Sequence, residues 1–198
     1  ARGGMGRVLV VHDGFLGRNV ALKELIDTGL DESQVEAIRK TLLATPGVRG
    51  LHELRTRRMA HQALVDAHVQ VDARISVSEG HRIAESARAR VLREHPEVLD
   101  VLVHIDPEDD LDPDFAATRL PSREVLLDEL AALLVDLPTP ERVMLHYLGG
   151  RVEVEIFLAH DFFADISALR SAEGALTERI RDHPAIRSIS LNLRVAPN

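Results

Sequence analysis

Hydrophobic and polar positions follow two periods along this chain. Over residues 63–72, Val65, Ala67, Val69 and Val71 alternate with polar residues, which is typical of a strand that buries one face. Strands are predicted over residues 48–57, 63–72, 98–105, 143–148, 152–158 and 186–195. Apolar spacings of three and four predict helices over residues 15–28, 31–45, 76–95, 122–135 and 165–181.

Local signals mark where the helices begin and end. Asp31 with Gln34, and Ser76 with Glu79, have the spacing of capping boxes at helix N-termini. A glycine after residue 28 is suited to end the first helix, and a Pro-Gly pair after residue 45 ends the second.

The order helix–strand–strand–helix–strand occurs twice, and a shift of 88 residues superposes the two copies. Their second helices end in the same motif, His95-Pro96 in one and His183-Pro184 in the other. A β-α-β crossover pairs parallel strands with a right-handed connection, so each copy is predicted to be a small split-βαβ sandwich. The sequence therefore predicts an α+β protein of two tandem α-β-β-α-β sandwiches, joined by an acidic linker at residues 108–120.

Composition narrows the classes of function. The 198 residues include no cysteine, which excludes disulfide frameworks, thiolate zinc fingers and cysteine nucleophiles. The formal net charge of −8 argues against a nucleic-acid partner, because phosphate binding uses clustered Lys and Arg. Aromatic residues make up 3% of the chain, too few for stacking surfaces. No apolar run reaches the ~18–20 residues of a membrane helix, so we expect this chain itself to be soluble.

Ten histidines are a high count, and four of them are grouped with one aspartate as candidate metal ligands. These residues are His52, His68, His81, His104 and Asp106. His68, His104 and Asp106 lie on the polar faces of two predicted strands. Alternation groups His52 with Leu54 and Thr56, so the face of the sheet on which His52 lies is not decided. Each histidine alone also fits an ordinary surface or cap residue, because no pair has the local spacing of a zinc finger.

Four motifs in fixed order carry a resemblance to a known family. They are Gly50-Leu51-His52-Glu53-Leu54, Val65-Asp66-Ala67-His68-Val69, Ser78-Glu79-Gly80-His81-Arg82 and Val101-Leu102-Val103-His104-Ile105-Asp106-Pro107. Together they closely resemble the cytoplasmic C-terminal domain of cation diffusion facilitator (cation efflux) transporters, over residues 12–108. The stretch 21–28 looks like the segment after that family's last membrane helix, and its Asp27 matches an aspartate implicated in a charge interlock.

The resemblance implies a fold, a partner and a metal site. It implies a ferredoxin-like (metallochaperone-like) fold, a homodimer, and a separate transmembrane domain that exports divalent metals, with this chain on the cytoplasmic side of the inner or plasma membrane. It implies that His52, His68, His104 and Asp106 bind metal near the dimer interface and that His81 reaches the partner subunit. Four histidines and a carboxylate favour Zn over Ca or Mg. No enzyme activity and no small-molecule substrate are implied.

The resemblance also divides the chain into four parts. We expect a juxtamembrane helical segment at 1–30, a cation-efflux dimerisation domain at 31–107, the linker at 108–120 and a degenerate ferredoxin-like repeat at 121–198. The residues that replace His68, His81, His104 and Asp106 at the 88-residue shift are Ile156, Leu169, Asn192 and Arg194. Because a guanidinium cannot bind a cation, this repeat is predicted to keep the fold and lose the site. His146 and His160, which lie in it, are interpreted as structural or surface residues.

Other classes of protein share some of these features. A purely structural dimerisation module without functional metal binding is the main alternative. A metal-dependent hydrolase would also use a histidine cluster, but no His-Glu-x-x-His motif supplies its general base. A Cu(I) chaperone of similar fold is excluded by the missing Cys pair. Metal binding by the acidic run at 106–114 is less favoured than a solvated connector, because nothing in the sequence fixes its geometry.

Overall fold

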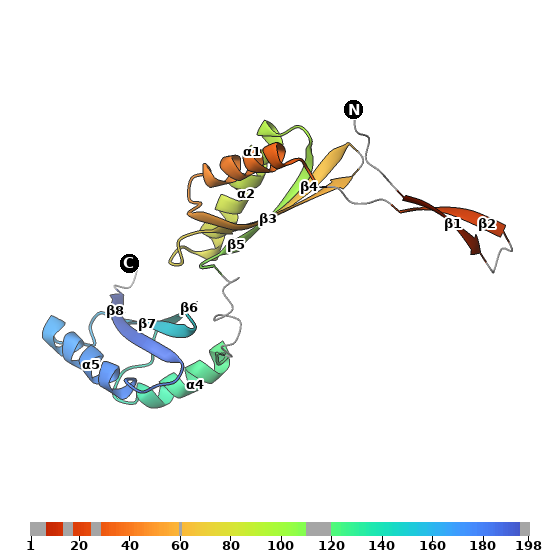
Figure 1. Ribbon diagram of the computed structural model, residues 1–198. Coiled ribbons are helices and arrows are strands. Elements are labelled where there is room, and N and C mark those ends of the chain that lie inside the picture. The colour runs from red at the N-terminus through yellow and green to blue at the C-terminus, as the bar shows by residue number, and fades with distance from the viewer. Residues whose placement is uncertain (1–6, 14–17, 25–28, 60, 110–119, 195–198) are drawn as a thin grey trace. The chain divides into compact units, whose positions relative to one another are not determined.

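Two units make up the chain, Ala1–Asp106 and Pro107–Asn198 (Figure 1). The computed structural model describes residues 7–13, 18–24, 29–59, 61–109 and 120–194. Within these residues, each unit contains a three-stranded sheet with two helices, and the first also contains a separate two-stranded sheet. The predicted α+β class, with two α-β-β-α-β units in tandem, is confirmed.

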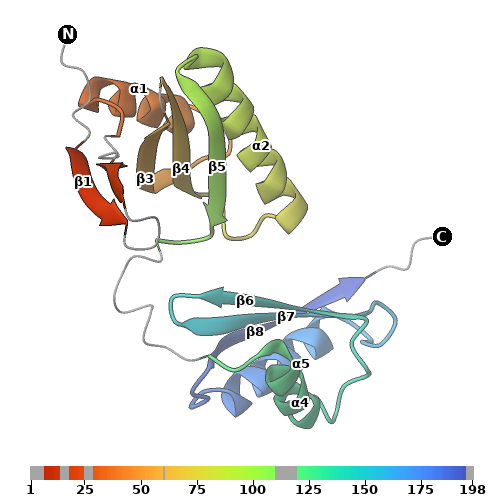
Figure 2. The ribbon, with the colours of Figure 1, turned by 90° about the vertical axis from the view of Figure 1, so that its right-hand side faces the viewer.

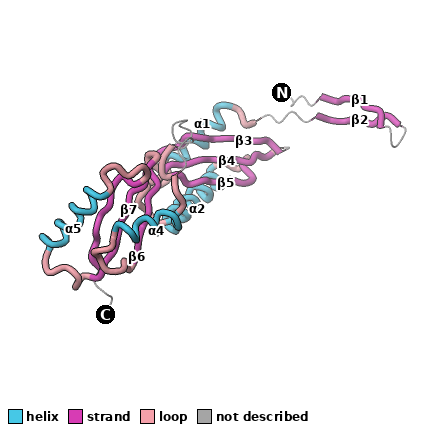
Figure 3. The backbone as a smooth tube through the Cα atoms, turned by 90° about the horizontal axis from the view of Figure 1, so that it is seen from below, coloured by secondary structure: helices cyan, strands magenta, loops and turns pink. Residues whose placement is uncertain are grey.

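The three-stranded sheet of the first unit has its two helices on one face (Figures 1 and 2). Its elements are α1 (Glu32–Leu43), β3 (Gly50–Met59), β4 (Gln62–Gln70), α2 (Val77–Glu94) and β5 (Val98–Asp106). The strand order is β3-β4-β5 (Figure 3). β3 is antiparallel and β5 parallel to the central β4. The parallel pair is the consequence of the α2 crossover.

The core of the first unit lies between this sheet and its helices. The alternating residues of β4 supply one side of it, and Ile38, Leu42, Ala87 and Val91 of the helices supply the other, all buried. Burial alternates residue by residue along β4, so the polar half of the strand lies on the face without helices. This open face is where any ligand site built on the strands must lie.

The segment before α1 is not helical where the structure describes it, and this part of the prediction is wrong. We predicted a helix over residues 15–28, but the structure has strands β1 (Arg7–Asp13) and β2 (Arg18–Glu24), paired antiparallel from Arg7↔Glu24 to Asp13↔Arg18. Residues 14–17 and 25–28, including Asp27, lie outside the described residues. The run of valines in β1 favours a strand, and pairing with it decides the conformation of β2, whose mixed apolar spacing was compatible with either structure.

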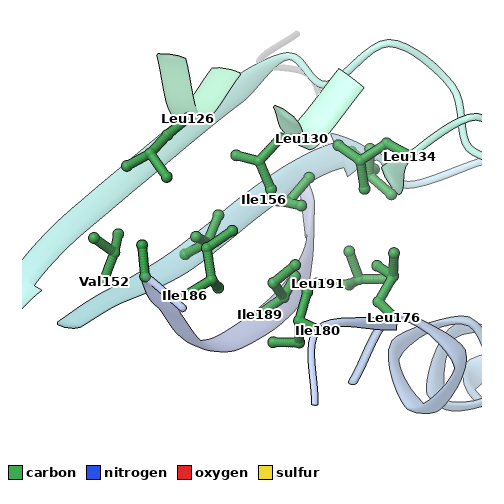
Figure 4. Packing of buried hydrophobic residues seen from close by; sticks show 13 residues of the cluster. Leu126, Leu130, Leu134, Val152, Ile156, Leu176, Ile180, Ile186, Ile189 and Leu191 are labelled. Carbon is green, nitrogen blue, oxygen red and sulfur yellow. The ribbon is translucent and has the colours of Figure 1, made fainter. Parts of the chain in front are cut away.

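The second unit repeats the arrangement of the first. Its elements are α4 (Arg123–Leu133), β6 (Arg142–Leu148), β7 (Arg151–Ala159), α5 (Ile166–Arg179) and β8 (Ile186–Arg194), with strand order β6-β7-β8. β8 begins and ends 88 residues after β5, as the repeat predicted. Leucines of α4 pack against Ile156 and Ile189 of the sheet and Leu176 of α5 in an entirely apolar core (Figure 4).

The repeated His-Pro motif ties the end of the second helix to the first helix in each unit. The buried His95 has its Nε2 2.8 Å from the Thr41 hydroxyl of α1. His183 has its Nε2 3.4 Å from a carboxylate oxygen of Glu129 in α4, and its Nδ1 accepts from the Ile186 N–H. Both histidines therefore have a structural role at the same place in the fold.

The N-caps of the first two helices are at the residues that the sequence predicted. Asp31 forms the complete capping box with Gln34 at the start of α1, and Ser76 accepts a hydrogen bond from the Glu79 N–H at the start of α2.

None of the helices in the described part of the chain has the length and apolar character that crossing a bilayer requires.

Candidate metal centre

Four of the five candidate ligands lie on the open face of the first unit's sheet, and His81 lies on α2. Parallel pairing of β4 with β5 sets His68 beside His104 and Gln70 beside Asp106. The His68 and His104 rings are stacked, with centroids 4.3 Å apart and planes inclined by 17°. Adjacent strands therefore bring together residues that are 36 positions apart in sequence.

His52 joins this face because of an irregularity in β3. The β3–β4 register runs from Leu51↔Val69 directly to Glu53↔His68, so His52 is the extra residue of a β-bulge. A bulge puts two residues opposite one and re-aims the side chain that it carries. Strict alternation would have grouped His52 with Leu54, which packs against the helix-side core, but the bulge turns it to the open face.

Two imidazoles then converge on one carboxylate. Asp106 Oδ2 lies 3.1 Å from His52 Nε2 and 3.0 Å from His68 Nδ1. One donor atom from each residue can be chosen so that all three lie within 4.8 Å of one another. The side chains of His52, Asp106 and His68 are 8%, 17% and 27% exposed, so the cluster is partly shielded from solvent yet reachable from it.

The other two candidate ligands occupy different positions. His104 contacts the cluster through its ring stack on His68 but is exposed and lies outside the three-donor group. His81 is an exposed residue near the start of α2, also outside that group within a single chain.

Glu53 is a neighbour of the cluster that the sequence did not single out. Its Oε2 lies 3.6 Å from His68 Nε2, and its Oε1 lies 2.5 Å from Arg55 Nη2. The facing of Glu53 depends on the bulge beside it, and one sequence carries no signal for the position of a bulge. Its place next to His52 in the motif was the only available hint.

The donor set suits a transition metal. Two imidazole nitrogens and a carboxylate oxygen match the ligands of Zn and similar ions, which bind neutral imidazole at ~2.0–2.1 Å. A gap of about 3 Å from each imidazole to the carboxylate leaves only small movements to reach coordination around a common ion. Three ligands leave a tetrahedral ion one open position.

The second unit holds a different set of side chains at the matching place. Parallel pairing of β7 with β8 sets Phe157 beside Asn192, as β4 with β5 sets His68 beside His104. The structural counterpart of His68 is therefore Phe157, an offset of 89 rather than 88 residues. The predicted counterpart, Ile156, is wrong: it is fully buried in the core on the other face of β7.

On the open face of the second sheet, charged side chains lie where the first unit has candidate ligands. The Arg142 guanidinium lies over the Phe157 ring at 5.9 Å, and Arg194 pairs with Glu141 at 3.9 Å. His146 Nε2 lies 3.3 Å from a Glu155 carboxylate oxygen, and its side chain is 11% exposed. His160 is exposed just beyond the end of β7, where its N–H donates to the Arg194 carbonyl.

The acidic linker lies mostly outside the described residues. Glu108 is one of its described carboxylates. Its Oε1 and Oε2 accept from the N–H of Gly149, in the hairpin of β6 and β7, at 3.2 and 2.9 Å. The only group in the described residues that could hold a metal ion through three donors is the one on the first sheet.

The fold and this donor set define a class, a small α+β domain that presents metal-ligating side chains on the open face of its sheet. Residues 30–108 match the family of cation efflux protein cytoplasmic domains. The match includes the four motifs that carried the resemblance.

Similar proteins are known in plants and bacteria. The chain is 27% identical over 203 residues to metal tolerance protein C1 of Arabidopsis thaliana, a match that covers 93% of this chain and 42% of that protein, and so extends through most of the second unit. It is 35% identical over 95 residues to metal tolerance protein 2 of Oryza sativa subsp. japonica, covering 48% of this chain and 23% of that protein. This chain thus spans less than half the length of these relatives.

One solved structure similar to part of this chain is MamM-CTD. It is 26% identical, with a TM-score of 0.38, and the match covers 39% of this chain and 98% of that one.

Proposed function

We propose that this chain is the metal-sensing, dimer-forming part of a transporter that exports a divalent, zinc-like cation. The observation that carries the proposal is the approach of His52, His68 and Asp106 donors to within 4.8 Å on an accessible sheet face. The relatives named metal tolerance proteins, and others named cation-efflux pump FieF, support the transport of metal by the whole protein. The transmembrane domain and the cytoplasmic location are part of the proposal.

The proposed ligand set has three central ligands, which are His52, His68 and Asp106. His104 is the adjacent ligand, which leaves its ring stack on His68 when metal binds. The exposed His81 is the residue that we assign to the metal of a second copy. A site that one chain cannot complete is a reason for a homodimer, because a two-fold axis supplies the missing donor from the partner.

Zn is the metal that this donor set favours. Imidazole and carboxylate together suit borderline ions, whereas Ca and Mg prefer sites made of oxygen atoms alone. Each histidine must be neutral to bind, so protons compete with metal for the imidazole nitrogens.

Metal shared between two copies would act as an effector of the transporter. A ligand shifts an equilibrium by its difference in affinity for the two states, and ions held jointly by two copies bind only when those copies are close. Cytosolic metal would thus draw the two domains together and bias the attached membrane part. Residues 31–107 are the domain to which we assign this role, and residues 121–198 a metal-free repeat that extends its packing surface.

Sedimentation of the full chain tests the proposal. With excess Zn²⁺ we expect a dimer that weakens when a chelator is added. A monomer under both conditions at micromolar protein contradicts the dimer, and the absence of any Zn²⁺ binding contradicts the sensing role.

A module that pairs copies without functional metal is the second candidate. Leu102 favours it: this large apolar side chain is 56% exposed on β5, on the same open face as His68. In that case the His52→Ala and Asp106→Ala variants would dimerise as the wild type does, with and without Zn²⁺.

A further inference from the structure

The two nitrogens of His68 face two different carboxylates. Nδ1 is hydrogen-bonded to Asp106 Oδ2 at 3.0 Å, and Nε2 lies 3.6 Å from Glu53 Oε2. Glu53 is the direct cross-strand partner of His68 in the β3–β4 register, and its side chain is 21% exposed. The ring is therefore bracketed, with the candidate metal position on one side and Glu53 on the other.

A neutral imidazole carries one proton, and the nitrogen that binds metal must be free of it. If Nδ1 binds, the proton is on Nε2, where it points to Glu53. Metal-binding histidines commonly donate their other ring N–H to a carboxylate, which fixes the tautomer and the ring orientation. The 3.6 Å separation is longer than a hydrogen bond, and a small rotation of the exposed part of either side chain closes it.

Glu53 is itself held in place. Arg55 follows it on the same face of β3, with Nη2 2.5 Å from Glu53 Oε1. One carboxylate oxygen is thus engaged by the guanidinium while the other faces the imidazole. This division gives Glu53 a defined orientation without occupying the oxygen that His68 needs.

The second unit offers an internal comparison. At the positions of Glu53 and Arg55 in the β6–β7 register stand Arg142 and Met144, opposite Phe157 and Glu155. Where the imidazole is absent, the carboxylate that would orient it and the guanidinium that would hold that carboxylate are absent too.

We propose that Glu53 is a positioning residue that accepts the Nε2 proton of His68 when a metal ion takes the place of the proton on Nδ1, and so presents Nδ1 to the metal, with Arg55 fixing Glu53. This inference rests on the proposed metal binding by His68. It adds a residue outside the ligand set, and a preference for one nitrogen of one ring.

The experiment compares Glu53→Ala with Asp66→Ala in the full chain, with Zn²⁺ as the probe. Asp66 lies on the same open face, two residues from His68, and its carboxylate pairs with Arg57 at 3.3 Å. Both variants remove one negative charge near the site, but only the first removes the acceptor that faces the ring. Loss of such a partner weakens metal binding by roughly 10-fold or more, whereas a screened surface charge changes it by only about 2-fold.

Ring ¹⁵N and ¹³C chemical shifts of His68 in the Zn²⁺-loaded protein supply the second measurement. We expect Nδ1 coordination in the wild type and a mixture of Nδ1 and Nε2 coordination in Glu53→Ala, with Asp66→Ala like the wild type. Coordination through Nε2 in the wild type, or equal loss of affinity in the two variants, overturns the inference. A wild type that binds no Zn²⁺ contradicts the proposed function instead, so the two failures are distinguishable.

Discussion

The two units have the same fold and opposite chemistry on the open faces of their sheets. Where the first unit has Glu53 facing His68, the second has Arg142 over Phe157. Where the first has the Asp106 carboxylate about 3 Å from two imidazoles, the second has Arg194 paired with a glutamate. The elements that form the core are retained, so the scaffold does not require the site, and the difference is confined to residues that face away from the helices.

Net charge does not follow the donor cluster. The first unit has 15 basic and 15 acidic residues and is neutral, whereas the second has 9 and 17, which accounts for the whole charge of −8. A diffuse field would favour cations at the second unit. The converging donors are nevertheless on the first, so local geometry and not net charge defines the candidate site.

The largest expected effect is that of making the first face resemble the second. Asp106→Arg removes the shared carboxylate and sets a cation beside His52 and His68, so we expect Zn²⁺ affinity to fall by more than about 100-fold. Calorimetric titration measures it. The matched control is Arg194→Asp, which should leave Zn²⁺ binding as it is. Wild-type affinity in Asp106→Arg would remove Asp106 from the site.

A core substitution should separate stability from metal binding. Ile156 is fully buried in the second unit, so Ile156→Ala should lower the free energy of unfolding of that unit by about 2–5 kcal/mol. Chemical denaturation followed by circular dichroism measures the loss. Because Ile156 lies in the core of the second unit and the candidate ligands lie in the first, Zn²⁺ affinity should be unchanged. A parallel loss of affinity would mean that the second unit supports the site.

Ligand truncation should have an effect in one unit only. His68→Ala and His104→Ala should each weaken Zn²⁺ binding by roughly 10-fold or more, as expected for lost imidazole ligands. His160→Ala, which removes an exposed imidazole of the second unit, should not weaken it. Titration of the three variants decides, and equal effects at all three positions would show that the ligand assignment is wrong.

The smallest effect concerns helix caps. Ser76 accepts a hydrogen bond from the Glu79 N–H, whereas Ser122, at the start of α4, donates to a Glu124 carboxylate and makes no side-chain cap bond. Ser76→Ala should therefore cost about 1 kcal/mol of stability and Ser122→Ala much less. Thermal unfolding of both variants is the measurement. A larger loss for Ser122→Ala would mean that the capping geometry is not what separates the two helices.

Much of the fold was predictable because its periodicity is simple. Alternation located β4 and β8 to within a few residues, and the capping box of Asp31 marked the start of α1. The failure at residues 18–24 has a physical cause: the apolar spacing there suited either a helix or a strand, and pairing with β1 decided between them.

The site was less predictable because it depends on register. Sequence grouped His52 with the other candidate ligands, but only the bulge in β3 turns it to their face and brings Glu53 opposite His68. A uniform shift of 88 residues likewise matched Ile156 to His68, although the β7–β8 register matches Phe157. A one-residue slip exchanges the two faces of a strand, and no single sequence reveals it.

Anomalous diffraction at the zinc edge, from crystals of the full chain grown with Zn²⁺, tests the central claim most directly. The account predicts a peak at about 2.0–2.2 Å from His68 Nδ1, His52 and Asp106, and no peak on the open face of β6, β7 and β8. A zinc ion bound instead by His146 or His160, or no peak at His68, would contradict it.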